Sequence, residues 1–244
     1  MTARPNPALT RTNWDLIRDA ASASPTARGS LDEVTRRVWP AIFAFIRASG
    51  RPADEAADLT QGFLADVFFS RHLLEKADQS RGRFRTLLLG SVRNYLADAH
   101  RRKTTRSRRP DRGVVTLDSE PAQARPPSDG GAHSPERAFH TRYVATLIRS
   151  ASERLQQELL AKGDEASWEI FRLRVLQAAF AGDAPGYDEI APRFGLDKGT
   201  CAARLLTTKR RFAAILMEEL RATVDDPSDL KAEIDELRTL LSGR

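Results

Sequence analysis

Carboxylates at helical spacing are the first candidates for chemistry in this sequence. Asp54, Glu55 and Asp58 lie close enough on one helix to offer oxygen ligands to a metal ion. Catalytic metal sites commonly add histidine, but the histidines are scattered with no His-x-x-x-His pair, at His72, His100, His133 and His140. We therefore predict no metal, no cofactor and no catalytic residue, and a metal-dependent enzyme is the most remote function that we consider.

Other catalytic signatures are missing from the sequence. It contains neither a Gly-x-x-x-x-Gly-Lys loop nor a Gly-x-Ser-x-Gly elbow. The only cysteine, Cys201, cannot form an intrachain disulfide and is expected on the inner face of a helix. Residues 1–12 have no apolar core of the signal-peptide type, and no segment is apolar enough to span a membrane. We expect a cytoplasmic protein that binds partners and no membrane.

Composition favours helices and a polyanionic partner. The 244 residues include 27 Leu and 35 Ala against 9 Val and 8 Ile, which favours an all-α fold. The formal net charge is +6, and the segment from His100 to Arg112 alone holds seven Arg and Lys against Asp111. Because residues 104–134 lose helical periodicity and are rich in Pro, Gly and Ser, we predict a flexible basic linker there.

This linker divides the chain into two predicted helical domains, 1–103 and 135–222, followed by an acidic helical segment, 223–244. In the first domain, Ser30 and Glu33 fit a capping box, and apolar residues at four-residue steps predict a helix that ends near Gly50. The next helix, from about Pro52, has a buried stripe and a polar stripe. The polar stripe contains Asp54, Asp58, Gln61 and Ala65.

The second domain is predicted to contain a helix-turn-helix. Ser134 and Pro135 form a strong helix start, and a short helix with Tyr187 and Ile190 precedes a turn at 195–199 and a long helix. The outward residues that could meet base edges are Thr200, Ala203, Arg204 and Thr207. Those expected to contact phosphates are Lys198, Lys209, Arg210 and Arg211.

Two sets of residues resemble one protein family. The segments 54–61 (DEAADLTQ), 82–88 (GRFRTLL) and 94–98 (NYLAD) are similar to region 2 of the extracytoplasmic-function sigma factors of bacteria. The segments 187–191 (YDEIA), 194–196 (FGL) and 199–201 (GTC), followed by Arg204 and Leu205, resemble their region 4. The similarity covers about residues 31–221, in the order and with the intervening linker of that family.

The resemblance implies an alternative sigma factor, a subunit that directs core RNA polymerase to promoters and performs no catalysis. It implies contacts with the clamp helices of the polymerase β′ subunit and with the β flap, and an anti-sigma factor is a further possible partner. The residues that match the polymerase-binding positions are Asp54, Asp58, Gln61 and Asp66. The residues of the part that opens the minus-10 element are Arg83, Arg85, Arg93, Asn94, Arg101, Arg102 and Lys103, and the helix after Gly199 matches the reader of the minus-35 element.

Three features depart from the family or lie outside the resemblance. Gly62 occurs in the middle of a helix, at a cost of about 1 kcal/mol relative to Ala, which suggests close packing or weaker docking. Ala202, Leu206 and Thr207 make the predicted reading surface unusually uncharged.

The last helix has Leu230, Ile234, Leu237 and Leu241 at 4-3-4 spacing and is expected to cap the second domain; the alternative is an autoregulatory segment that shields the DNA-binding surface.

Two other functions remain open from the residues alone. A stand-alone helix-turn-helix regulator would bind DNA without polymerase, and a sigma-like adaptor would have lost the initiation role. Binding to core polymerase distinguishes the sigma factor from the regulator.

Overall fold

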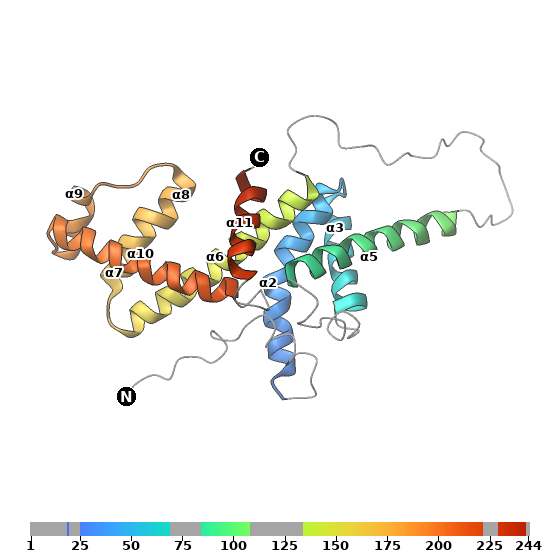
Figure 1. Ribbon diagram of the computed structural model, residues 1–244, viewed down its shortest axis with the longest axis horizontal. Helices are drawn as coiled ribbons and strands as arrows, with labels where there is room; N and C mark the ends of the chain where they lie inside the picture. Colours follow the sequence, from blue (N-terminus) through green and yellow to red (C-terminus); the bar gives the residue numbers. More distant parts are fainter. Residues whose placement is uncertain (1–18, 20–24, 69–83, 108–133, 222–228, 243–244) are drawn as a thin grey trace. The chain divides into compact units, whose positions relative to one another are not determined.

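A computed structural model describes residue 19 and residues 25–68, 84–107, 134–221 and 229–242 (Figure 1). The predicted all-α fold is confirmed over these residues, which form helices joined by turns and contain no strand. The chain divides into two compact units. One contains the described residues up to Val144 together with the last helix, and the other contains those from Ala145 to Arg221.

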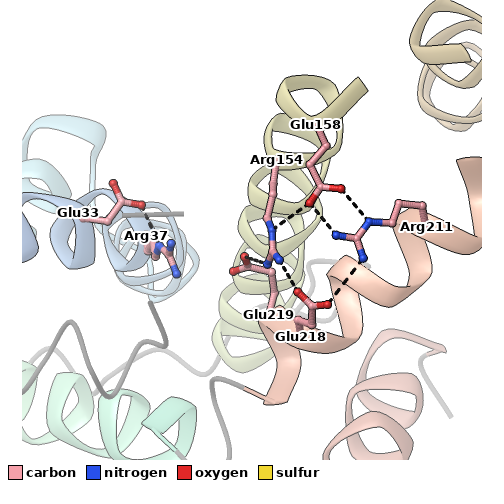
Figure 2. Close-up of polar contacts among 7 residues, drawn as sticks. All are labelled: Glu33, Arg37, Arg154, Glu158, Arg211, Glu218 and Glu219. Atoms are coloured by element: carbon pink, nitrogen blue, oxygen red, sulfur yellow. Dashed lines mark hydrogen bonds and ion pairs between the residues drawn. The ribbon is translucent and has the colours of Figure 1, made fainter. Parts of the chain in front are cut away.

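The first unit is built on helix α2 (Ala27–Ala48), whose predicted apolar stripe is confirmed. Val34, Val38, Ile42 and Ile46 are all buried. The predicted capping box is wrong, because the helix begins before Ser30, and the Ser30 hydroxyl donates to the Asp19 carboxylate. Glu33 instead accepts a hydrogen bond from Arg37 over 2.9 Å, one helical turn along (Figure 2).

Helix α3 (Ala53–Phe63) continues into a π-helical turn, η2 (Leu64–Phe68), and α3 packs against α5 (Phe84–Ser107). Phe63 and Tyr95 meet edge to face, with 5.7 Å between their ring centroids. Helix α5 includes residues 104–107, which we had assigned to the linker. The rest of that predicted linker up to residue 133 lies outside the described residues.

Helix α6 (Pro135–Ala161) begins where the sequence predicts, and the Arg137 amide donates to the Ser134 hydroxyl over 3.2 Å. The boundary between the two units falls within this helix, between Val144 and Ala145. The last helix, α11 (Asp229–Ser242), belongs to the first unit, whereas we had expected it to cap the second domain.

The second unit contains the remainder of α6 and a series of short helices before the long helix α10 (Lys198–Arg221). In order, the short elements are α7 (Glu165–Phe171), the π turn η4 (Arg172–Gln177), α8 (Ala178–Ala181), α9 (Tyr187–Ile190) and the 3-10 turn η5 (Ala191–Phe194). Their core includes Leu155, Ile170, Phe171 and Ile215, with Cys201 on the inner face as predicted.

The elements of the predicted helix-turn-helix occur in the predicted order. After α9 and η5, Gly195 has a φ of 62°, a left-handed conformation that favours glycine. Helix α10 begins at Lys198, so Gly199 is helical and is not part of the turn as we had predicted. Asp197 explains this early start, because its carboxylate accepts from the Thr200 amide over 2.9 Å and caps the helix.

The close packing predicted at Gly62 is confirmed. A Cβ atom added there would lie 2.3 Å from the hydroxyl oxygen and 3.5 Å from Cζ of Tyr95. A Cβ atom added at Gly90, within α5, would meet open space. The glycine in α3 therefore allows the tyrosine of α5 to approach the helix backbone.

We predict opposite stability effects for alanine at these two glycines. Gly62→Ala should lower the free energy of unfolding by about 1–3 kcal/mol, because the clash outweighs the gain in helix propensity. Gly90→Ala should raise it by about 0.5–1 kcal/mol. Urea denaturation followed by circular dichroism measures both changes.

A second substitution tests the cause. Adding Tyr95→Phe to Gly62→Ala removes the clashing oxygen and leaves a contact at ordinary distance, so most of the lost stability should return. Equal stabilities of Gly62→Ala and Gly90→Ala would contradict the packing argument.

Candidate functional site

The first candidate surface is an acidic ridge along α3 and η2, made of Asp54, Asp58, Gln61 and Asp66, all of which are exposed. An unbroken α-helix would turn Asp66 away from the other three. The π turn η2 rotates less per residue than an α-helix, which reduces this divergence. Asp54, Asp58 and Gln61 therefore share one exposed face of α3, and Asp66 is exposed on the turn that follows.

The interior face of α3 holds this ridge outward. Ala56, Thr60 and Phe63 are buried, and the Thr60 hydroxyl donates to the Ala56 carbonyl over 2.7 Å. The neighbouring Glu55 pairs with Arg51 over 3.2 Å. Burial, followed by the negative charge of Asp66, raises the pKa of Tyr95.

The second candidate surface is the exposed face of α10. Thr200, Ala203 and Thr207 follow one another at three- and four-residue steps and are exposed, with Arg210 three residues further on and Lys209 beside it. Leu206, on the same helix, is 51% exposed, which is unusual for leucine in this structure. We define the α10 face by its six residues, which are Thr200, Ala203, Leu206, Thr207, Lys209 and Arg210. It combines an apolar and hydroxyl-bearing centre with cations toward its C-terminal side.

Three cations that we predicted to contact DNA from this helix, Lys198, Arg204 and Arg211, form ion pairs with residues of the same unit. Lys198 forms an ion pair with Asp188. Arg204 pairs with Asp164 over 2.8 Å, and the same carboxylate caps α7 by accepting from the Ser167 amide. The Lys198 pair is exposed, whereas the Arg204 pair is partly buried and directs that guanidinium toward α7, so less positive charge is available on this surface than the sequence suggested.

Arg211 belongs to a network of charges that joins α10 to α6 (Figure 2). Its guanidinium donates to both oxygens of Glu158, each over 2.7 Å. Arg154 binds Glu218 and lies 3.6 Å from Glu158, and Glu219 completes the network. The hydrogen bond from Arg211 lowers the pKa of Glu158. Sequence reasoning missed this network, which gives Arg211 a positioning role in the unit.

The predicted DNA contacts of α5 have different surroundings. Asn94 and Arg102 are exposed, Arg93 pairs with Glu136 over 2.6 Å, and Arg101 lies 3.6 Å from Asp98. Lys103 lies in the helix, but its side chain is outside the description, and Arg83 falls outside the described residues altogether. The first turn of α5 differs most from expectation, because Arg85 is buried.

Arg85 is 1% exposed, so our prediction that it offers its charge to DNA does not hold for this arrangement. Its Nε and Nη2 atoms donate to the two carboxylate oxygens of Glu233 over 2.8 and 3.0 Å. Nη2 also lies 3.1 Å from Glu236, and Nη1 lies 2.9 Å from Nδ1 of His140. We call these four residues the Arg85 cluster. It joins α5, α6 and α11.

The pKa values of the two ionisable bases in the cluster shift in opposite directions. Burial lowers the pKa of Arg85, but its hydrogen bonds and charge interactions with Glu233 and Glu236 outweigh that effect and raise it. Burial, together with the positive charge of Arg85, lowers the pKa of His140 to about 4. A neutral imidazole keeps an unprotonated nitrogen, here Nδ1, that can accept from Arg85.

No protein family, curated protein or solved structure matches this chain. Within the described residues, no group of three or more His, Cys, Asp or Glu is arranged to hold a metal ion. None of the described helices is long and apolar enough to cross a membrane. Burial raises the pKa of the Cys201 thiol, which makes it a weak nucleophile.

The neutral state of His140 predicts a pH dependence of stability. The unfolded chain binds a proton at this histidine near pH 6.5, and the folded chain does so only near pH 4. Stability should therefore fall as the pH drops from 7 to 5, by about 1–2 kcal/mol from this residue. Glu136, Glu233 and Glu236 partly offset the positive charge of Arg85 around the ring.

Urea denaturation at pH 7 and pH 5 measures this effect. His140→Gln keeps an acceptor for Arg85 but cannot titrate. The loss of stability between pH 7 and pH 5 should therefore be smaller by about 1–2 kcal/mol than in the wild type. His100→Gln, at an exposed histidine of α5, should keep the wild-type dependence. An unchanged loss in His140→Gln would show that another group titrates.

Proposed function

We propose that this protein is an alternative sigma factor of the extracytoplasmic-function type. It binds core RNA polymerase in the bacterial cytoplasm and directs the enzyme to promoter DNA. In this proposal it contributes no catalytic group and needs no cofactor. An anti-sigma factor is a further possible partner.

The observation that carries the proposal is the acidic ridge. Its four exposed side chains lie at the positions that resemble the polymerase-binding surface of that family, and buried residues of α3 hold them outward. An acidic and amide surface is complementary to a basic partner. We propose that the ridge contacts the clamp helices of the β′ subunit.

The α10 face supports the second half of the proposal. A helix that follows a short helix and a glycine turn can enter the major groove of DNA. Exposed Thr200, Ala203 and Thr207 would face base edges, Leu206 could contact a thymine methyl group, and Arg210 would bind phosphate. In the proposed role this face reads the minus-35 element, and the exposed end of α5 approaches the minus-10 element.

We predict that Asp58→Arg abolishes co-elution with core polymerase in size-exclusion chromatography, because it places a like charge against a basic partner. Asp32→Arg is the matched control, since Asp32 is an exposed carboxylate of α2 outside the ridge. It should co-elute like the wild type. Intact assembly of Asp58→Arg would contradict the proposed interface, and DNA binding without any polymerase binding would favour the stand-alone regulator.

We also predict that Arg210→Gln weakens binding to duplex DNA. Loss of one phosphate contact should lower the magnitude of the slope of log affinity against log salt concentration by about 1. Arg149→Gln removes an exposed charge from α6 in the same unit and should leave the slope unchanged. Fluorescence anisotropy at several salt concentrations measures both. Equal slopes for the two variants would exclude Arg210 as a phosphate contact.

A further inference from the structure

Helix α11 attaches to the first unit through a narrow seam with a carboxylate at its centre. Among its residues with described side chains, Leu230, Glu233 and Leu237 are buried, and Ile234 is partly buried. A seam of this kind holds the helix by a few apolar contacts and by the ion pairs of Glu233 and Glu236 with Arg85. Docking of α11 therefore depends strongly on the pairing between Glu233 and Arg85.

The Arg85 guanidinium is bound in a way that a phosphate group could reproduce. Glu233 presents two oxygens to Nε and Nη2 over 2.8 and 3.0 Å, and Glu236 adds a third oxygen at 3.1 Å. The planar fork of arginine matches carboxylate and phosphate oxygens with similar geometry. Glu233 and Glu236 thus occupy positions around Arg85 that phosphate oxygens would take.

Two properties make this docking reversible. An isolated helix of 14 residues is marginally stable in water, so α11 gains its order from the contact. A buried ion pair also carries a large desolvation cost and holds two surfaces together less strongly than an apolar core does. A polyanion such as DNA, whose closely spaced phosphates interact with several cations at once, can therefore compete with the helix.

We propose that α11 is an internal competitor of the DNA phosphate backbone for Arg85. With α11 docked, Arg85 is sealed and the first unit binds DNA weakly; with α11 released, the start of α5 gains a cation for phosphate. The competition rests on the proposed function, because promoter DNA is the phosphate source to which we assign it. It also gives α11 a role that the resemblance to sigma factors does not supply.

Variants that each remove one negative charge from α11 test the competition in the full chain. Glu236→Gln and Glu233→Gln weaken the hold on Arg85, and Asp235→Asn removes the same charge from an exposed position of the same helix. The probe is a fluorescein-labelled 30-base-pair duplex whose binding is measured by anisotropy at several salt concentrations.

Glu233→Gln should bind the duplex about three- to tenfold more tightly than the wild type, because a larger fraction of the chain is then competent to bind. The slope against salt should steepen by about 0.9 for the one added phosphate contact. Glu236→Gln, at a more exposed carboxylate, should show a smaller change in the same direction. If Asp235→Asn tightens binding as much as Glu233→Gln does, net charge explains the effect and the competition is refuted.

Hydrogen exchange of the unaltered chain gives a second test that does not depend on how the variants fold. Saturating duplex should accelerate exchange of the α11 amides, since a released helix loses protection. Unchanged protection of α11 in the DNA complex would overturn the proposal, as would failure of the wild type and all variants to bind duplex.

Polymerase binding separates this proposal from the proposed function. If the chain co-elutes with core polymerase but α11 stays protected on DNA, the proposed function stands and the competition is refuted. If DNA releases α11 but the chain does not bind polymerase, the competition stands and the sigma-factor role is refuted.

Discussion

A buried guanidinium must be paired, and this requirement determines where the last helix of the chain packs. Arg85 lies at the start of α5 and Glu233 lies 148 residues later, yet the two form a bidentate pair that is almost closed to solvent. Leaving either charge unpaired in the interior would cost several kcal/mol. The N-terminal unit therefore includes α11, which contributes the carboxylates that Arg85 needs.

Ion pairs also engage several arginines of the second unit. In the second unit, Arg154 and Arg211 are engaged with glutamates of α6 and α10, and Arg204 is engaged with Asp164. The net charge of +6 consequently overstates how many cations face outward on α10. Lys209 and Arg210 are exposed beside the uncharged centre of the α10 face. That separation suits a surface in which charge holds DNA and apolar contacts discriminate bases.

Local patterns in the sequence predicted the helices, and tertiary pairing decided what the sequence could not. The stripe of α2, the start of α6 and the exposure of Asp54, Asp58 and Gln61 follow from helical periodicity and capping alone, whereas Asp66 was chosen from the resemblance. The burial of Arg85 did not, because its partners come from the far end of the chain. One signal was available: Glu233 lies between Leu230 and Leu237 at three- and four-residue steps, and a carboxylate within an apolar stripe requires a buried cation.

The contact between Gly62 and Tyr95 connects the ridge to α5. The hydroxyl oxygen of Tyr95 lies so close to the α3 backbone that no methyl group fits between them, so α3 cannot move toward α5 without displacing this ring. Asp66 of the ridge also acts electrostatically on the same tyrosine. Ridge and α5 are thus joined at a contact with little freedom to adjust. Under the proposed function, a polymerase that binds the ridge would also constrain the helix that carries Arg85, so docking on the enzyme and access to DNA would be coupled within one unit.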